Sequence, residues 1–589
     1  MFKTDSPYIK ELLKCKIEWK PFTRETFERA QSEDKLIFIH IGNISNIENR
    51  NLAYTLFKDE RVAAMLREHF ISIPIDTEDV PEAYLIGMDL LLINEQKISE
   101  HINIFSLPGI RPVTSFSSLY PDDFLQVATN VATAFIHKRQ KLEKASEYLT
   151  RRLQFSGLVT RKEEAKPIAP KILHAYIRSW SSRFLDKPGK YSRHPYILNP
   201  RNLTFILEYA HRYNVKEYLH YISETLEHVY HSAVFDPIDG GIFRSSADYS
   251  FTLPSYEKTI YDNANAAILF TIAHKYLRKK IFKEAAERIV YFLEQEMNLH
   301  RKGFITYITL NKGSKESSYY KYSLKELEDA FQKKYRIIAH ILGMNTGEEK
   351  NAQQVISNTE RYWELTPEEI AKLKAIRNRK KGEVIYDKRV MTGYNCRTAI
   401  AFCLLAGYSK KGQKEEYLKM AKEIIDNIVN HRKKDRTHLY KYLSPTKLEY
   451  STSDLYDYSL LLNSLLHYYM LTKDKSCFEL AKTYTAHIYE GHFHIESGMF
   501  NKTCRHASEL KVKRAPVIDY NTLSSNSIMA DNLLLLHKIT KDKKCLELFE
   551  QQIYNIQPQL IGSGPFMAGW GMQVLNYLTG YLHLGTEEQ

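Results

Sequence analysis

Residues 240–265 read GGIFRSSADYSFTLPSYEKTIYDNAN and combine features that recur further along the chain. A double glycine marks a turn, an aromatic stretch leads to Pro254, and a helix is expected to open around Glu257. The opening of this helix gathers acidic, basic, amide and aromatic side chains, which are the residue types that bind polar ligands. This helix mouth is therefore the first candidate for a functional site.

Comparable helix openings recur through the C-terminal part of the chain. They are expected near Asn202, Asp262, Leu324, Asn395, Asp457 and Asn526, at spacings of about 60 to 70 residues. Second helices are expected between them, and glycine–aromatic turns occur at Gly240, Gly303, Gly498 and, more weakly, Gly564. Six helix pairs punctuated in this way predict a closed (α/α)6 toroid over residues 170–589. Residues 345–385 break the pattern and are expected to be an insertion.

The N-terminal part alternates between strand and helix patterns. Apolar runs predict strands at 35–41, 70–76 and 112–116, with helical segments between the first two. A strand, a helix, a parallel strand and a proline-led strand follow one another in the order of a thioredoxin-like fold. We therefore expect a multidomain protein, with an α/β thioredoxin-like domain over 1–145, a charged linker or helical tail over 146–169, and the all-α toroid.

Composition limits the class of protein. The 589 residues exceed one ordinary core, and the hydrophobic fraction of 43% with 26% charged residues is typical of a soluble protein. No apolar run or leader pattern is evident, so we expect a cytoplasmic location with no membrane partner. The net charge of +13 comes largely from lysines interspersed with glutamates, which makes nucleic-acid binding unlikely. The six cysteines form no C-x-x-C pair, and no metal or cofactor is expected.

The N-terminal sequence also resembles a known family. Ser6-Pro7-Tyr8, Trp19, Ile41-Gly42, Phe57 and Asp76 follow the order and spacing of the spermatogenesis-associated protein 20 family. The resemblance implies a thioredoxin-like domain fused to a six-hairpin helical toroid.

Where this family ordinarily carries Cys-His-Trp-Cys-His, the chain has Asn46 and Asn49 at the cysteine positions. An amide can act neither as the thiolate nucleophile nor as the resolving thiol, so these degenerate redox positions predict no thiol–disulfide exchange. The resemblance also places Pro112 where thioredoxin-like folds hold a cis proline, and implies that the bond before it could be cis.

The resemblance continues through the helix openings of the toroid. Residues 254–264 resemble the family's Pro-His-Phe-Glu-Lys-Met-Leu-Tyr-Asp-Asn-Ala, with Ser255 in place of the histidine. Asp387 and Asn395 are kept, but Lys388 and Tyr394 replace an aspartate and a tryptophan. Two further motifs of the family are changed. Beside Asp457 this chain lacks the second aspartate of the family's pair, and Thr309-Leu-Asn311 stands where the family carries Asp-Ala-Asp. The departures fall on the most reactive residue types.

The candidate site residues are those retained at the helix openings. Candidate catalytic carboxylates are Glu257, Asp262, Asp387 and Asp457. Candidate ligand-binding residues are Arg244, Lys258, Tyr261, Asn263, Tyr394, Asn395, Tyr458 and Asn526. A structural role is an equally open interpretation, because buried aspartates and asparagines cap neighbouring repeats and Arg244 could join two repeats through an ion pair. His194, His220 and His467 lack metal-ligand spacing.

Two functions remain open. The first is a divergent, redox-inactive protein that binds a small polar, carbohydrate-like ligand in the toroid, or a protein partner through the thioredoxin-like domain. The second is a carbohydrate-active enzyme, either a glycoside hydrolase or a sugar isomerase or epimerase, because toroids of this kind are shared with six-hairpin glycosidases and N-acylglucosamine 2-epimerases. Hydrolysis needs two carboxyl groups separated by about 5 Å or about 6.5–9.5 Å. Whether the protein is an enzyme is left open by the sequence.

Overall fold

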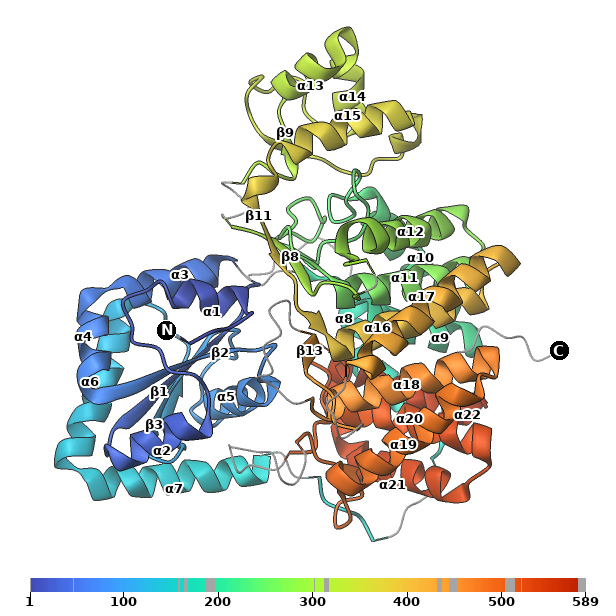
Figure 1. Ribbon diagram of the computed structural model, residues 1–589. Coiled ribbons are helices and arrows are strands. Elements are labelled where there is room, and N and C mark those ends of the chain that lie inside the picture. The colour runs from blue at the N-terminus through green and yellow to red at the C-terminus, as the bar shows by residue number, and fades with distance from the viewer. Residues whose placement is uncertain are drawn as a thin grey trace. The chain divides into compact units, whose positions relative to one another are not determined.

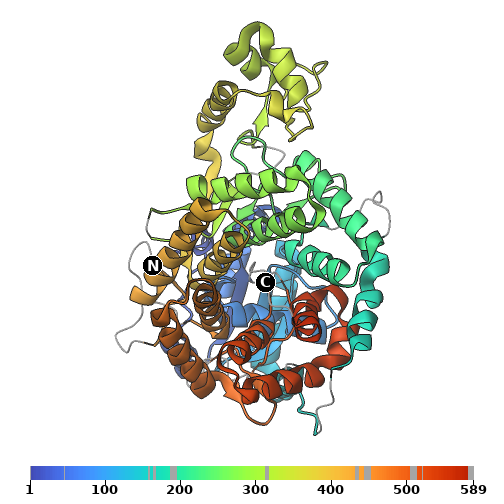
Figure 2. The same ribbon diagram turned by 90° about the vertical axis from the view of Figure 1, so that its right-hand side faces the viewer.

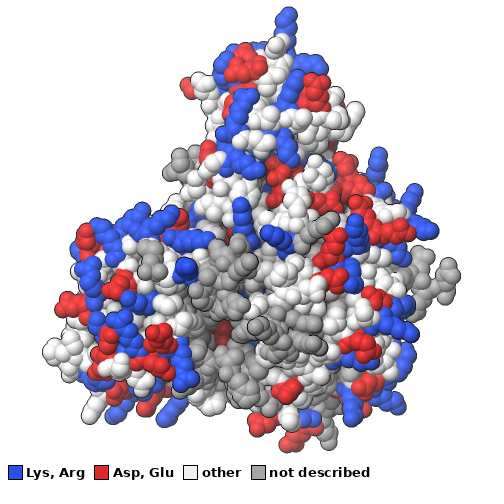
Figure 3. Space-filling view, in the orientation of Figure 1, with Lys and Arg blue, Asp and Glu red and all other residues white. Residues whose placement is uncertain are grey.

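The computed structural model describes residues 2–45, 47–156, 159–163, 168–185, 196–300, 302–311, 317–431, 437–443, 453–503, 514–520 and 522–580. The chain divides into two compact units. Unit 1 comprises Met1–Val159, Ser444–Asp454 and Asn501–Ala515, and unit 2 comprises the remaining segments. Within the residues described, no helix is both long and apolar enough to cross a bilayer. Figure 3 shows basic and acidic side chains intermingled over the face that it presents.

Unit 1 is built on a four-stranded mixed sheet (Figure 1). Its strands are β1 (Leu36–Gly42), β2 (Phe70–Asp76), β3 (Ile102–Leu107) and β4 (Arg111–Phe116), in the order β2-β1-β3-β4. Strands β1 and β2 are parallel, whereas β3 pairs antiparallel with both β1 and β4. The helices are α1 (Pro7–Leu12), α2 (Arg24–Ser32), α3 (Ile47–Lys58), α4 (Glu60–His69), α5 (Pro81–Ile93), α6 (Pro121–His137) and α7 (Arg139–Ser156). This arrangement confirms the thioredoxin-like fold.

Strands β1 and β2 are buried because they are almost continuously apolar. Every residue of β1 and β2 is buried, as expected of parallel strands covered by helices on both faces. The rings of Phe38, Phe105 and Phe124 pack with centroids 5.1 to 5.7 Å apart. Among the peptide bonds that the structure describes none is cis, so the possible cis bond before Pro112 is trans. Asn46 lies outside the described residues, and Asn49 lies in α3.

Unit 2 contains a closed ring of paired helices (Figure 2). The inner helices are α9 (Pro200–Arg212), α11 (Ile260–Leu277), α16 (Thr392–Gly407), α18 (Leu455–Thr472), α20 (Ser525–Thr540) and α22 (Ala568–Thr579). Each inner helix contacts the next, and α22 contacts α9. The outer helices are α10 (Lys216–His231), α12 (Lys280–Phe292), α17 (Lys411–Asn430), α19 (Lys475–His492), α21 (Lys543–Gly562) and α8 (Pro170–Leu185). The ring confirms the predicted (α/α)6 toroid.

The sequences of the helices explain their places in the ring. Inner helices such as α11 are apolar on nearly all sides, because each lies between two neighbours and an outer helix. Outer helix α12 instead buries one face, through Phe282, Ile289 and neighbouring residues. The prediction that the third inner helix begins near Leu324 was wrong, because Leu324 begins a helix that lies outside the ring. The sixth inner helix is α22, and α8 pairs with it to close the circle.

An insertion between β8 (Tyr307–Leu310) and β11 (Val384–Asp387) forms a small helical subdomain. It contains α13 (Leu324–Phe331), α14 (Tyr335–Ile341), α15 (Pro367–Asn378) and the pair β9 (Lys321–Tyr322) and β10 (Gln354–Val355). Its own hydrophobic cluster includes Leu327, Leu342 and Leu373. Figure 1 shows these helices outside the ring of unit 2.

Short strands lie between the helix pairs. Strand β7 (Lys258–Thr259) pairs with β8 just before α11 begins. The other pairs are β5 (Tyr196–Ile197) with β6 (Ser245–Ser246), β12 (Val390–Met391) with β13 (Tyr442–Leu443), and β14 (Phe493–His494) with β15 (Met499–Phe500).

Candidate functional site

Three of the predicted ligand-binding asparagines form the same hydrogen-bonded arrangement, which we call the asparagine clamp. Asn263 accepts from the Ile242 N–H (2.8 Å) and donates to the carbonyls of Ile242 (3.2 Å) and Thr259 (2.9 Å). The amide of Asn395 bonds in both directions to Phe304, and that of Asn526 does so to Phe500. Each clamp therefore joins an inner helix to the segment after a glycine turn.

The clamps explain the glycines beside them. Gly241 and Gly303 have positive φ angles of 74° and 103°. A Cβ on either residue would lie 2.9 Å from the clamp oxygen of Asn263 or Asn395. Glycine is required at these turns both by the backbone conformation and by the close approach of the amide. These amides are used in holding the toroid together.

The predicted catalytic carboxylates have partners within the toroid. Asp387 forms a buried bidentate ion pair with Arg389, with a closest contact of 2.5 Å. Asp457 accepts from the Gly393 N–H (3.0 Å) and pairs with Lys441 (2.8 Å). Such buried pairs fix neighbouring segments, because separating the two charges would leave one of them unsolvated.

The remaining two candidate carboxylates lie at the mouth of α11. Asp262 accepts from the hydroxyl of the N-cap residue Thr259 (2.8 Å) and lies 3.6 Å from Nε of Arg244. Glu257 is buried, and its backbone carbonyl accepts from the Arg244 N–H (2.8 Å). The candidate Arg244 therefore joins two segments of this repeat.

Lys258, which lies just before α11 begins, belongs to a buried cluster of charged residues. Its Nζ lies 2.6 Å from Asp236 and 2.8 Å from the carbonyl of Gly240. Arg377 from α15 contacts the same aspartate at 2.7 Å. Burial opposes ionisation of Asp236, but the charges of Arg377 and Lys258 hold its pKa below the ordinary value. Burial lowers the pKa of Lys258. The cluster ties the insertion to the ring.

The aromatic candidates contact neighbouring repeats. The hydroxyl of Tyr261 accepts from the Leu523 N–H (3.0 Å), and its ring lies 5.5 Å from that of Tyr394. The hydroxyl of Tyr458 accepts from the Leu439 N–H (3.2 Å). None of the twelve candidate residues at the helix mouths is among those lining the cavity described next.

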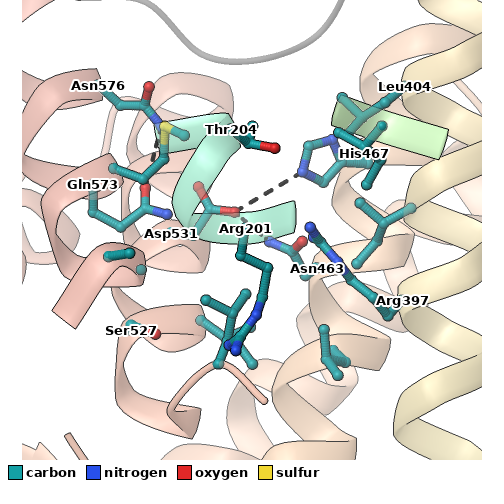
Figure 4. Close-up of a pocket in the computed structure, with 18 of the residues that line it drawn as sticks. Arg201, Thr204, Arg397, Leu404, Asn463, His467, Ser527, Asp531, Gln573 and Asn576 are labelled. Atoms are coloured by element: carbon teal, nitrogen blue, oxygen red, sulfur yellow. Dashed lines mark hydrogen bonds and ion pairs between the residues drawn. The ribbon is translucent and has the colours of Figure 1, made fainter. Parts of the chain in front are cut away.

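A cavity of about 100 Å³ lies within the ring and is lined by residues from all six inner helices or the segments just before them (Figure 4). The polar and charged residues that line it are Arg201, Thr204, Arg397, Asn463, His467, Ser527, Asp531, Gln573 and Asn576. Isoleucines and leucines such as Ile268 and Leu404 complete the wall. An apolar wall with a few converging polar groups is the usual composition of a small-molecule site.

The polar side chains of the cavity form a connected set on one side. Asn463 donates to Asp531 (2.8 Å), and Nε2 of His467 lies 4.0 Å from the same carboxylate. Nδ1 of His467 is buried with no partner in the described part of the chain. Arg397 donates through Nε and Nη2 to the side-chain oxygen of Asn265 (3.0 and 2.7 Å). Figure 4 shows Arg201, Arg397, Asn463, His467 and Asp531 around the same space.

These cavity residues were not among the sequence candidates. Arg397, Asn463, His467 and Asp531 lie further into the inner helices than the mouths, whereas Arg201 and Ser527 lie in the first turns of α9 and α20. Arg397 is the only charged residue of α16, and Asp531 is the only acid of α20. A lone charge inside an otherwise apolar helix is the signal that could have identified them, because such charges are rarely buried without a reason.

Comparisons with known proteins agree with this architecture. Residues 1–154 match the family model Thioredox_DsbH, described as "Protein of unknown function, DUF255". Human spermatogenesis-associated protein 20 is 21% identical over 340 residues, which cover 55% of this chain and 43% of the human protein. The uncharacterized protein B0495.5 of Caenorhabditis elegans is 23% identical over 288 residues, covering 47% and 38% of the two chains. The matched regions thus span less than half the length of these relatives.

Solved structures similar to the chain include a D-mannose isomerase, with 12% identity, a TM-score of 0.43 and coverage of 66% of this chain and 87% of that one. Another is a family 76 α-mannanase from Bacteroides thetaiotaomicron, with 11% identity, a TM-score of 0.42 and coverage of 69% and 96%. The sequence matches confirm the resemblance to the spermatogenesis-associated protein 20 family: residues 1–154 match the Thioredox_DsbH family model, and the chain continues into an (α/α)6 toroid.

Proposed function

We propose that the toroid binds a small polar, carbohydrate-like ligand in the cavity between its inner helices. The observation that carries this proposal is the convergence of charged and amide side chains from different repeats on one space, as Figure 4 shows for Arg201, Arg397, Asn463 and Asp531. Folding alone does not require polar groups there, since burying them has a free-energy cost. At about 100 Å³, the cavity is smaller than the roughly 300–1,000 Å³ of sites for drug-sized ligands, so the ligand is small.

Glycoside hydrolysis is disfavoured because the described residues of the cavity wall supply one carboxylate where the reaction needs two. Both retaining and inverting mechanisms use a pair of carboxyl groups on either side of the scissile bond. Among the described residues that line the cavity, Asp531 supplies one carboxylate and no second is present. The candidates Asp387 and Asp457 are held in buried ion pairs. Binding without hydrolysis is therefore the function that the geometry supports best.

Proton transfer on a bound sugar is the second candidate function. His467 lies in the cavity wall with Nδ1 unpartnered among the described residues, and its Nε2 lies 4.0 Å from Asp531. A histidine oriented by a carboxylate can accept a proton from the carbon next to a carbonyl and return it, which is the chemistry of sugar isomerisation. This candidate rests on the His467–Asp531 pair alone.

The thioredoxin-like domain is proposed to act without redox chemistry, as a structural or partner-binding module. The support is the sequence itself, since Asn46 and Asn49 stand where a thiolate and a resolving thiol would be needed. A protein partner recognised by this domain is part of the same proposal.

A thermal-shift screen of neutral hexoses, hexuronates and sugar phosphates tests the binding proposal. At least one compound should raise the unfolding temperature, because a ligand that binds only the folded state stabilises it. Asp531→Asn should change the size of that shift, whereas the outer-helix control Asp426→Asn should leave it unchanged. No shift with any compound would refute cavity binding.

The proton-transfer candidate needs a different measurement. A compound found in the screen is incubated with the protein in D₂O, and deuterium incorporation next to its carbonyl is followed by NMR. Incorporation that is lost in His467→Gln, while the thermal shift persists, would support isomerase-like chemistry. Binding without incorporation would leave the protein as a binder and reject this second candidate.

A further inference from the structure

We infer that the ligand of the toroid cavity is an anion, and that Arg201 and Arg397 recognise its carboxylate or phosphate group. This inference rests on the proposed function, because it concerns the same cavity. It names the chemical class of the ligand, which the proposed function leaves open.

The first observation is the charge of the cavity wall. The lining includes two arginines and one carboxylate, Asp531, among the residues that the structure describes, so with a neutral His467 its formal charge is +1. Asp531 is already engaged by Asn463 and lies beside His467. Between packed helices, where the effective dielectric constant is lower than in water, an excess positive charge attracts an anion more strongly than it would at the surface.

The second observation is that neither arginine has a carboxylate partner. In the described part of the chain, Arg201 donates through Nη2 to the Tyr520 carbonyl (3.0 Å), and its Nη1 is buried without a hydrogen-bond partner. Arg397 donates through Nε and Nη2 to one neutral oxygen, that of Asn265. Among the residues that the structure describes, no carboxylate oxygen lies within 4.0 Å of a guanidinium nitrogen of either arginine. Each guanidinium thus keeps N–H donors for a further acceptor.

The third observation is that the two cations are neighbours. Burial lowers the pKa of Arg397, and the charge of Arg201 acts in the same direction, whereas Tyr261, Tyr456 and Asp531 oppose the shift without reversing it. Figure 4 shows both side chains directed into the same space, from α9 and α16. Two like charges held near each other with neutral partners carry a desolvation and repulsion cost that a bound anion would remove.

Neighbouring groups offset part of this cost at Arg201: burial lowers its pKa, but Tyr261, Asp519 and Asp262 together raise it, although none of the described carboxylates forms a direct ion pair with it. The Arg201 guanidinium lies 5.6 Å from the centroid of the Tyr261 ring, a modest cation–π contact. The nearby carboxylate of Asp519 accepts instead from the backbone N–H groups of Ser524 and Gly569, both at 2.7 Å, and burial raises its pKa. A ligand anion is the remaining source of a direct ion pair, and planar guanidinium groups bind carboxylate and phosphate with two parallel hydrogen bonds.

Isothermal titration with matched sugars tests the inference. Glucose, galactose and mannose are compared with glucuronate, galacturonate and mannuronate, and with their 6-phosphates, at low ionic strength. At least one acid or phosphate should bind roughly tenfold or more tightly than its neutral hexose, as expected for an added charge-assisted bond. The uronates and phosphates separate the two anion chemistries. The control amine glucosamine should bind more weakly than glucose.

Variants tie the preference to the two arginines. Arg397→Met and Arg201→Met should each reduce the anion-to-neutral ratio by about tenfold, and the exposed control Arg178→Met should not change it.

The outcomes separate this inference from the proposed function. Neutral hexoses that bind as tightly as their acids, or an anion preference that survives in both methionine variants, would overturn the anion inference and leave cavity binding standing. No binding by any sugar, acid or phosphate would overturn both.

Discussion

Replacing Asn263 by alanine tests whether the best-preserved helix mouth is structural. The substitution removes three hydrogen bonds and leaves the buried N–H and C=O groups of Ile242 without these partners. Each buried group left unsatisfied costs about 1–3 kcal/mol, so we expect a loss of about 4 kcal/mol in the stability of the toroid. For about 400 residues with an unfolding entropy of about 2.1 cal/mol/K each, this lowers Tm by about 5 °C.

The assay is thermal unfolding followed by circular dichroism, with the transition of the toroid compared between variants. Asn395→Ala and Asn526→Ala should show decreases of similar size, because both residues form the same clamp. The exposed Asn430, the last residue of α17, provides the control, and its alanine variant should remain within about 0.5 kcal/mol of the wild type. An Asn263→Ala protein as stable as this control would refute the structural interpretation. Asn263 would then again be a candidate for ligand binding.

Three further predictions follow from individual contacts. Arg389→Met should destabilise the toroid by about 3–5 kcal/mol in thermal unfolding, because Asp387 would remain buried without its partner, and a change below about 1 kcal/mol would contradict this. Burial lowers the pKa of His40 to about 4. As the pH falls from 6.5 to 4, the unfolded chain therefore takes up a proton at His40 that the folded chain does not, and this residue should cost unit 1 about 3 kcal/mol of stability, in addition to the contribution of the buried His101, whose pKa burial also lowers. His40→Gln should reduce the slope of that dependence in urea titrations, and an unchanged slope would show that other groups cause it. In an insulin-reduction assay the protein should show no turnover, since Asn46 and Asn49 provide no thiols, and activity abolished by replacing Cys15 would contradict this.

Much of unit 1 could be predicted from its apolar runs, but β3 could not. Strands β1 and β2 are almost continuously apolar, and their sequence alone indicates burial. Strand β3 alternates apolar residues with Asn103 and Ser106, which are nevertheless buried. Asn103 is tolerated there because its oxygen bonds to Nδ1 of His40 (2.8 Å) and its amide donates to the Ser118 carbonyl (2.9 Å). These partners are distant in sequence, so the local pattern does not reveal them.

The number of ring helices was predictable, but the identity of the sixth was not. The segment at Leu324 begins with a capping box formed by Ser323 and Glu326, which makes it a strong helix start outside the ring. Helix α22 begins with Ala568 and Gly569, which offer no polar signal. Its place in the ring comes from packing against α9 and α20. Local start signals therefore identify helices but do not say which of them close a toroid.

The cavity residues were missed for a related reason. Arg201 and Asp531 are separated by most of the toroid sequence and come together only because the ring closes. The residues at the helix mouths share recognisable motifs, but those motifs specify clamps and ion pairs that hold repeats together. The resemblance therefore identified the scaffold, whereas the polar interior of the ring had to come from the three-dimensional arrangement.

A crystal structure of the protein soaked with the tightest-binding sugar acid or phosphate would test the central claim most directly. The account predicts ligand density inside the ring, with the anionic group within hydrogen-bond distance of Arg201 and Arg397. A cavity left without ligand, with the compound bound at the helix mouths around Glu257 and Asp262 instead, would contradict it.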